Sequence, residues 1–211
     1  MIYYDSGKIR EENAAMDDRL KHQLDFALEI DKEKNVFRQT HLSGHGRNEN
    51  DAEHAWHMAI MAYLLKEYSN EPVDIGKVML MCLIHDIVEI DAGDTYAYDP
   101  DAKKTQKARE TAARDRIFSL LPEDQKDELS ALFDEFEAQE TSEARFARAM
   151  DNLQPLILNN SNGGSDWREH GVHASQVYRR QSETRPGSEK LYEVTDAIIK
   201  DHIGRGNLMT F

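Results

Sequence analysis

The feature that most constrains this chain is an apolar run that ends abruptly in ionisable residues. Residues 78–84 (Val-Met-Leu-Met-Cys-Leu-Ile) carry no charge, and residues 85–94 (His-Asp-Ile-Val-Glu-Ile-Asp-Ala-Gly-Asp) follow at once. Burying so many ionisable groups is costly unless they are paired or bound to a metal ion. In a helix, His85, Asp86 and Glu89 lie on one face, because Glu89 follows the other two by three and four positions. The stretch therefore indicates a metal site with a carboxylate beside it.

Apolar residues recur at helical spacing along most of the chain, and no segment shows convincing two-residue alternation. We therefore expect one all-α domain, residues 1–211, of six to eight helices with no significant sheet. Residues 1–13 are expected to form an N-terminal arm, and residues 39–51 a loop. The predicted helices are about 14–30, 52–68, 75–88, 102–121, 123–137, a segment from 142, a segment from 172, and 189–203.

Particular side chains set the expected ends and faces of these helices. Asp51, Asp74 and Ser188 are predicted N-caps, because a short polar side chain can accept a hydrogen bond from the free backbone amides of a first turn. Pro155 is expected to bend or break its helix. In helix 52–68, the buried stripe is expected to contain Trp56, Ala59, Ile60, Tyr63 and Leu64.

Net charge limits the partners that this chain can have. The formal charge of −14 argues against nucleic acid or an anionic membrane surface as the main partner. No apolar run reaches the roughly 18 residues of a membrane span, and the first residues lack the features of a signal peptide. The single cysteine, Cys82, lies in the apolar run and is expected to be buried. We expect a cytoplasmic protein.

Two imidazoles and two carboxylates stand out as candidate metal ligands. They are His54, His85, Asp86 and Asp151, a set that suits a divalent transition ion. Each is a weak signal alone, and Asp151 could instead pair with Arg148. Nearby histidines have simpler interpretations: His57 is expected to pack in the core or to support the ligands. His41 and His45 are expected to be exposed in the loop, with a second metal or substrate role as the alternative.

Three segments together resemble the H…HD…D pattern of the HD-domain metal-dependent phosphohydrolases. They are residues 50–56 (Asn-Asp-Ala-Glu-His-Ala-Trp), 83–94 and 149–151 (Ala-Met-Asp), and the resemblance covers about residues 24–159. The His-Asp pair, followed by a Glu and a Gly-Asp turn, is most similar to the branch that contains the 5′-deoxynucleotidases. Residues 167–171 (Trp-Arg-Glu-His-Gly) also resemble a segment of this branch, but no chemical role follows for them.

The resemblance implies a role for seven residues. One divalent ion, which could be Mn, Co, Zn, Fe, Ni or Mg, would be held by His54, His85, Asp86 and Asp151. Glu89 would orient or deprotonate the attacking water, Asp94 would handle the leaving group or the sugar, and Arg38 would bind phosphate. These roles agree with the ability of such an ion to lower the pKa of water, and with the planar, bidentate guanidinium of arginine.

Simpler interpretations of three of these residues remain open. Glu89 could be a solvated helix-end residue, Asp94 an Asx-turn residue, and Arg38 a partner for nearby acids or an aromatic face. Members of this branch often carry an aromatic residue directly after the arginine, whereas this chain has Gln39. Stacking of a base or sugar at that position is therefore not supported.

The function implied is removal of the 5′-phosphate from nucleoside monophosphates, with a preference for deoxyribose. One alternative is hydrolysis of another small phosphoester or of a nucleoside triphosphate, although the extra basic residues that a triphosphate requires are not evident near the motifs. A second alternative is a regulatory domain that binds metal and nucleotide without turnover. Because relatives in this branch commonly form homodimers, the resemblance also implies a homodimer, on a face that the sequence does not identify.

Overall fold

The computed structural model describes residues 17–99 and 101–210, and the predicted N-terminal arm lies outside these ranges. Within them the fold is all-α, as predicted, and the ten α-helices exceed the expected six to eight because three short ones have only four to eight residues. The helices are α2 (Asp18–Glu29), α3 (Asp51–Leu65), α4 (Ile75–Ile84), α5 (Glu89–Ala92), α6 (Lys103–Phe118), α7 (Glu123–Ala138), α8 (Ser142–Ser161), α9 (Ser165–Glu169), α10 (Ala174–Gln181) and α11 (Glu189–Gly204). Short 3-10 turns are η2 (Ile30–Asn35), η3 (Lys66–Tyr68) and η4 (Ser182–Thr184).

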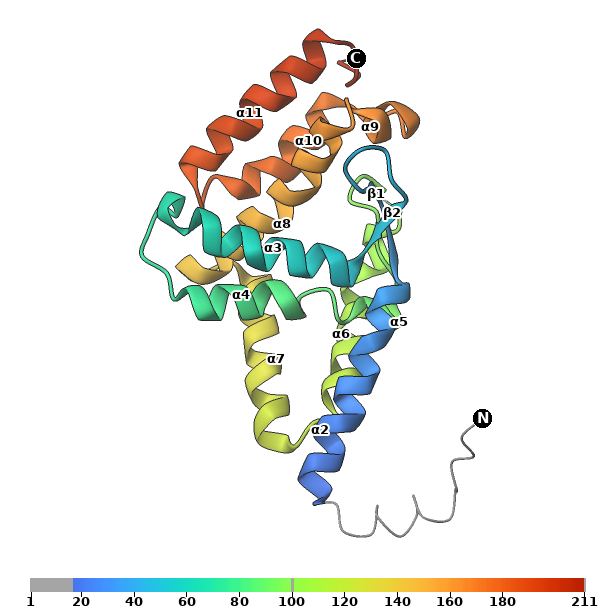
Figure 1. The fold of residues 1–211 in the computed structure, drawn as a ribbon, viewed down its shortest axis with the longest axis vertical. Coiled ribbons are helices and arrows are strands. Elements are labelled where there is room, and N and C mark those ends of the chain that lie inside the picture. Colours follow the sequence, from blue (N-terminus) through green and yellow to red (C-terminus); the bar gives the residue numbers. More distant parts are fainter. Residues whose placement is uncertain (1–16, 100, 211) are drawn as a thin grey trace, which may run out of the picture.

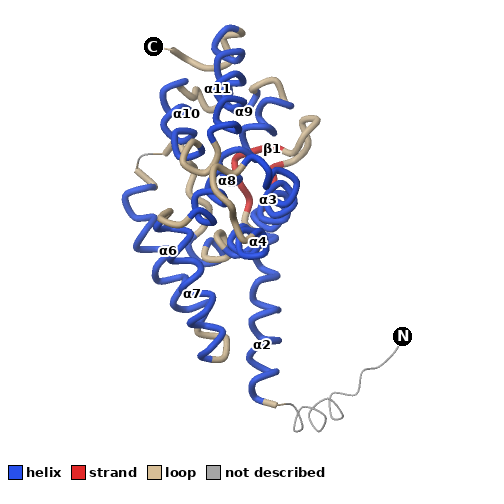
Figure 2. The backbone as a smooth tube through the Cα atoms, turned by 90° about the vertical axis from the view of Figure 1, so that its left-hand side faces the viewer, coloured by secondary structure: helices blue, strands red, loops and turns tan. Residues whose placement is uncertain are grey.

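The helices pack in three tiers along the long axis of the molecule. Helices α3 and α4 form the middle tier with the long helix α8, which contacts both of them and also α7, α10 and α11. In Figure 1, α2, α6 and α7 extend below this tier, and α9, α10 and α11 lie above it. The view turned by 90° in Figure 2 keeps the same order. Residues of α3, α4 and α8 are thus brought together from widely separated parts of the chain.

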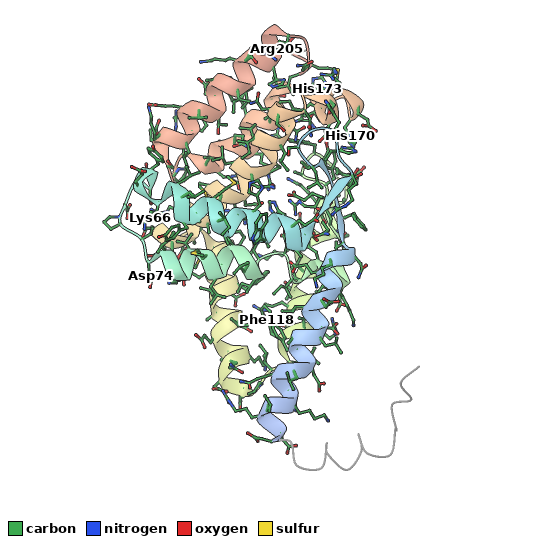
Figure 3. All side chains as sticks on the ribbon, in the orientation of Figure 1. Lys66, Asp74, Phe118, His170, His173 and Arg205 are labelled. Carbon is green, nitrogen blue, oxygen red and sulfur yellow. The ribbon has the colours of Figure 1, made fainter. Side chains whose placement is uncertain are left out.

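Aromatic and methionine side chains fill the core between these tiers. Phe118, labelled in Figure 3, packs against Phe26 and Phe133 with both pairs of ring centroids 6.3 Å apart. Met58, Met81 and Met150 are fully buried where α3, α4 and α8 meet. Full burial of such a side chain contributes about 1.5–3 kcal/mol, so the tiers are joined by a continuous apolar core.

The predicted buried face of α3 is wrong except at Ala59, which is buried. Trp56 is 63% exposed and Leu64 is 63% exposed, while Met58 and Ala62 are fully buried. Apolar residues surround most of α3, so the periodicity of its sequence does not identify one face. The small Ala and flexible Met side chains face α4 and α8 and allow close helix packing, and the larger aromatic and leucine side chains lie on the outer surface.

The predicted loop over residues 39–51 is also partly wrong, because a small hairpin forms there. Strands β1 (Phe37–His41) and β2 (Asn48–Asn50) pair antiparallel, with Phe37 opposite Asn50 and His41 opposite Asn48. Besides this two-stranded sheet, the described residues contain one isolated bridge, between His173 and Met209, as expected for a chain with no significant sheet. The hairpin brings residue 38 against the start of α3.

A side chain that caps a helix is occupied by the backbone amides of the first turn, so the identity of each cap shows which polar side chains remain available to the site. Asn50, and not Asp51 as predicted, caps α3: its side chain accepts from the Glu53 amide, and the Glu53 side chain accepts from the Asn50 amide. The carboxylate of Asp51 is therefore available to the site. The predicted caps Asp74 and Ser188 are confirmed, and α8 runs unbroken through Pro155. None of the described helices combines the length and apolar character needed to cross a membrane.

Candidate metal centre

The four predicted metal ligands meet at one buried point. His54 comes from the first turn of α3, His85 and Asp86 follow the end of α4, and Asp151 comes from the middle of α8. His54 Nε2 lies 3.3 Å from Asp151 Oδ1 and 3.8 Å from Asp86 Oδ2. His85 Nε2 lies 3.1 Å from Asp86 Oδ1 and 3.9 Å from Asp151 Oδ1. Ring nitrogens and carboxylate oxygens thus face one another across a few ångströms.

The outer hydrogen bonds of the two imidazoles turn their lone pairs toward this point. His54 Nδ1 donates to Gln154 Oε1 at 2.8 Å, and His85 Nδ1 donates to the Cys82 carbonyl at 2.9 Å. In each neutral ring the Nε2 atom then carries the lone pair, which is the arrangement that a metal-binding histidine requires. Cys82 itself is buried and unpaired, as predicted.

These residues fit a divalent cation. His85 Nε2 is buried and has no hydrogen-bond partner among the described residues, so this atom is available to a cation. Ligand atoms of His54, His85 and Asp151 all lie within 4.8 Å of one another, and Asp86 adds a carboxylate beside them. Two imidazoles and two carboxylates suit Mn, Fe, Co, Ni or Zn. A bound cation would offset the repulsion between the two buried carboxylates and would bind the two ring nitrogens.

The two histidines have opposite pKa shifts in the protein without a bound cation. Burial lowers the pKa of His54 to about 4. Burial also disfavours a charged His85, but the neighbouring carboxylates of Asp86 and Asp151 outweigh it and raise the pKa of His85 to about 9. His85 therefore carries a proton in the metal-free protein, and a bound cation would displace it.

Two arginines hold the second oxygen of Asp151. Arg148 Nη1 and Arg180 Nη2 each donate to Asp151 Oδ2 at 2.9 Å, which leaves Oδ1 directed toward the histidines. Burial works against ionisation of this carboxyl, but Arg180, His54 and Arg148 together hold its pKa well below the usual value. The pairing of Asp151 with Arg148 and its position as a candidate ligand are thus compatible, since they use different oxygens.

Gln154 links the ligands to a further buried acid. Its Oε1 accepts from His54, while its Nε2 donates to Glu49 Oε1 at 2.6 Å and lies 3.0 Å from His57 Nδ1. His57 thus contacts the residue that holds His54, a position compatible with the packing or supporting role expected for it. Burial raises the pKa of Glu49 to about 7, so this network also contains a carboxyl that titrates near neutrality.

Arg38, the predicted phosphate-binding residue, lies between two carboxylates. Its Nη1 donates to Asp86 Oδ2 at 2.7 Å and to Asp51 Oδ1 at 3.1 Å, and its side chain is only 12% exposed. Burial disfavours the charged guanidinium, but Asp86 and Asp51 outweigh this and raise its pKa well above the usual value. Arg38 therefore orients one candidate metal ligand, and its guanidinium also lines the adjacent cavity.

A second group of acids borders the metal centre. Ligand atoms of Asp51, Glu89 and Asp94 lie within 4.8 Å of one another, close enough to hold a cation together. Burial, followed by repulsion from Asp86 and Asp51, raises the pKa of Glu89 well above its usual value. Burial also raises the pKa of Asp51 to about 7 and that of Asp94 above the ordinary range. All three carboxyls therefore keep a proton to higher pH than ordinary carboxyls do.

The turn that carries Asp94 is held from another helix. Gly93 has φ of +72°, a backbone conformation that glycine adopts without strain. Arg109 from α6 donates to the Ala92 carbonyl and, at 2.7 Å, to Thr95 Oγ1. The predicted Gly-Asp turn is therefore present, and its position beside the metal centre is set by Arg109.

A cavity of about 150 Å³ opens from the metal centre. Its inner wall is formed by His85, Asp86 and Asp151, with Arg38, Glu89 and Asp94 beside them. Arg180 also faces this space, and Tyr96, Tyr98 and Gln39 line it farther along. The cavity thus combines a site for a cation, proton-carrying carboxyls, arginines suited to an anion and an aromatic wall.

Several residues of this site were not predictable as site residues from the motifs alone. Arg180 and Glu49 come from elements far from the motifs, and no local pattern marks them. Gln154 lies three positions after Asp151 on the same helix face, and Asp51 three before His54, so helical spacing could have identified both. His41, expected to be exposed, instead binds Asp166 through both its backbone amide and Nδ1, at 3.1 and 2.9 Å.

Comparison with known proteins identifies the fold and its relatives. The model of the HD domain family matches residues 30–192, which include every candidate ligand and also Arg38 and Arg180. A solved structure from Magnetospirillum magnetotacticum MS-1, named as a predicted metal-dependent phosphohydrolase, is 48% identical, with a TM-score of 0.87 over 90% of this chain and 96% of that chain. The PH0347 protein from Pyrococcus horikoshii OT3, at 15% identity and a TM-score of 0.58, shares the fold.

Curated relatives share the part of the chain that contains the motifs. The 5′-deoxynucleotidase HDDC2 of Homo sapiens is 32% identical over 111 residues, which are 53% of this chain and 53% of that protein. A 5′-deoxynucleotidase of Vibrio atlanticus (strain LGP32) is 34% identical over 92 residues, 39% of this chain and 47% of that protein. The chain spans about half the length of the curated relatives it matches.

Proposed function

The chain belongs to the HD-domain family, and on this premise we propose that it is a metal-dependent phosphohydrolase that removes the 5′-phosphate from deoxynucleoside monophosphates. The observation that carries the proposal is the convergence of two imidazole lone pairs and two carboxylates on a cavity that also contains Glu89, Asp94 and arginines. The relatives named 5′-deoxynucleotidase support the substrate class.

The proposed ligands of one divalent ion are His54, His85, Asp86 and Asp151. When bound, such an ion supplies Lewis-acid stabilisation of a phosphoryl oxygen and makes water more acidic. The chain's own groups fix the ligands: Gln154 and the Cys82 carbonyl hold the two rings, and Arg148 and Arg180 hold Asp151. Such outer contacts commonly change metal affinity or activity by 10–100-fold when removed.

Glu89 and Asp94 are proposed to move protons. Glu89 is buried at the cavity wall with one carboxyl oxygen unpartnered among the described residues, so it can accept the proton of the attacking water. Burial raises the pKa of Asp94, and a protonated Asp94 can donate to the 5′-oxygen of the leaving nucleoside. Glu89 thus accepts a proton from the attacking water, and Asp94 gives a proton to the leaving 5′-oxygen.

Arg38 and Arg180 are proposed to bind the phosphate group. Both line the cavity, and both already contact a proposed metal ligand, Arg38 through Asp86 and Arg180 through Asp151. A guanidinium has five donors, so it can bind a carboxylate and a phosphate oxygen together. These two cations offset locally the repulsion that a chain of charge −14 exerts on a phosphorylated substrate.

The substrate assignment is tested by phosphate release from a panel of nucleotides with Mn or Co. We expect inorganic phosphate from deoxynucleoside 5′-monophosphates, and slower release from ribonucleotides. Pyrophosphate or tripolyphosphate from a nucleoside triphosphate would instead favour the triphosphatase alternative. Tight binding of metal and nucleotide without turnover would favour a regulatory domain and would contradict the proposed activity.

We also propose that the chain forms a homodimer through the outer faces of α3 and α4. These neighbouring helices expose six large apolar side chains: Trp56, Ile60, Tyr63 and Leu64 from α3, and Leu80 and Leu83 from α4. Apolar surface of this kind on a charged protein is typical of interaction sites. Two copies of the same face can cover each other about a two-fold axis.

The dimer proposal predicts that a charge on this face separates the subunits. Trp56→Glu combined with Leu64→Glu is expected to change the mass in solution from two chains to one, because burying two carboxylates in an apolar interface is unfavourable. Size-exclusion chromatography with light scattering measures this change. Val194→Glu on α11 is the control, because Val194 is also an exposed apolar residue. A wild-type protein that is monomeric, or a double variant that stays dimeric, would contradict the proposed interface.

Two further assignments follow the same reasoning. We propose that residues 1–211 form a single HD-type domain, because the family match extends over residues 30–192. We propose a cytoplasmic location, because the buried, unpaired Cys82 suits a reducing compartment.

A further inference from the structure

Three segments far apart in sequence meet at one side of the cavity, where Tyr96 and Gln39 line it and His170 contacts both of them from outside. The ring of Tyr96 lies 5.1 Å from that of His170 and 5.3 Å from that of Tyr98, both in edge-on arrangements. His170 Nε2 lies 3.3 Å from Gln39 Oε1. Tyr96 comes from the loop after α5, His170 from the end of α9 and Gln39 from β1. Figure 3 shows His170 beside the β1–β2 hairpin. The cluster Gln39, Tyr96 and His170 is called the rim below.

The rim is joined to the proposed catalytic residues by the chain itself. Gln39 directly follows Arg38, and Tyr96 is two residues after Asp94, so each lies within about 7 Å of backbone from a proposed catalytic or phosphate-binding residue. Gln39, Tyr96 and Tyr98 line the same cavity as Asp86 and Arg38. A ligand whose phosphate lies at the metal centre would therefore extend toward the rim.

The rim is fixed to the body of the protein. Asp166 of α9 accepts from both the backbone amide and Nδ1 of His41 on β1, which ties the helix that precedes His170 to the strand that carries Gln39. The Asn162 side chain donates to the carbonyls of His41 and Leu42 and accepts from the His45 amide. Because α9 and the hairpin are connected in this way, the spacing between His170 and Gln39 is set by the fold.

We propose that Tyr96, His170 and Gln39 form the site that binds the nucleobase of the substrate. This proposal rests on the proposed nucleotidase function. The half-buried Tyr96 ring and the exposed imidazole offer the flat surfaces on which a planar base stacks. The Gln39 amide has both a donor and an acceptor for the polar edge of a base. His170 thus gains a role within the segment 167–171, and aromatic stacking comes from Tyr96 although position 39 is a glutamine.

The test compares a nucleotide with a phosphoester that has the same sugar and no base. The variants are Tyr96→Ala and His170→Ala, and the substrates are dAMP and 2-deoxyribose 5-phosphate. We expect KM for dAMP to rise about 10-fold in each variant, since removal of one stacking side chain weakens base binding by roughly 5- to 150-fold. For 2-deoxyribose 5-phosphate we expect KM to stay unchanged, and kcat to change little for either substrate. Tyr96→Phe should retain the wild-type KM, because it keeps the ring.

Controls separate this proposal from a general loss of structure. Tyr192→Ala on α11 removes an aromatic residue that packs against Arg185 outside the cavity, and it should leave both KM values unchanged. Equal rises in KM for both substrates, or no rise for either, would overturn the proposed base site.

A binding measurement keeps the two proposals distinguishable. If the wild type releases phosphate from neither substrate, the proposed activity fails, and the rim is then tested by calorimetric titration with dAMP. Weaker dAMP binding by Tyr96→Ala than by the wild type would still support the base site. Equal binding by the two proteins, or no binding by the wild type, would overturn it.

Discussion

Asp86→Asn is expected to remove both the metal ion and the phosphate-releasing activity. The carboxylate of Asp86 lies 3.1 Å from His85 Nε2, and its other oxygen accepts from Arg38 at 2.7 Å. An amide has no charge for the cation, and it leaves the buried Arg38 with one fewer anionic partner. Because loss of an outer hydrogen bond at a metal site already costs 10–100-fold, we expect loss of a ligand to reduce activity by more than about 100-fold.

Metal content by mass spectrometry and phosphate release together check this prediction. The matched control is Asp91→Asn, because Asp91 lies five residues further along the same stretch but is more exposed and pairs with Arg116. The control should retain metal and activity. An Asp86→Asn protein that folds, binds metal as the wild type does and releases phosphate would show that Asp86 is not a ligand.

Glu89→Gln is expected to reduce kcat by about 10²- to 10⁴-fold, the usual contribution of a general base, while metal binding is retained. The amide has the shape of the carboxyl group but cannot accept the proton of the attacking water. The pH dependence gives an independent signature. Burial and repulsion from Asp86 and Asp51 raise the pKa of Glu89, so at low pH it is protonated and cannot act as a base, and wild-type activity should rise with pH.

The Glu89→Gln variant should lack this rise with pH on the acid side. The control is Glu67→Gln on the exposed turn η3, which should keep both the rate and the pH profile. A Glu89→Gln enzyme with a wild-type kcat, or a loss of metal equal to that of Asp86→Asn, would contradict the assignment of Glu89 as a base.

The sequence was sufficient for the parts of the site that depend on order along the chain. The candidate ligands His54, His85, Asp86 and Asp151 stand out in the sequence because ionisable residues interrupt apolar helices in a recognisable order. The roles of these residues remain proposals, but the fold brings all four within reach of one another. Helical segments were also predictable, since caps such as Asp74 and Ser188 act within a single turn.

Features that depend on packing between distant segments were not predictable. Trp56 belongs to a helix that is apolar on nearly every side, so only the position of α4 and α8 decides which face is buried. Arg180 contacts Asp151 across 29 positions, and His170 meets Gln39 across 131. No local pattern encodes such contacts. The hairpin at β1 was missed because its strands are too short for alternation to be visible.

The central claim is that one divalent ion at His54, His85, Asp86 and Asp151 is required for release of phosphate from a nucleoside monophosphate. The most direct measurement is phosphate release from dAMP by protein stripped of metal with a chelator, followed by stepwise addition of Mn. We predict no activity in the metal-free protein, and a rise that reaches most of its final value near one equivalent per chain. Full activity in the metal-free protein, or no phosphate release at any Mn concentration, would contradict the claim.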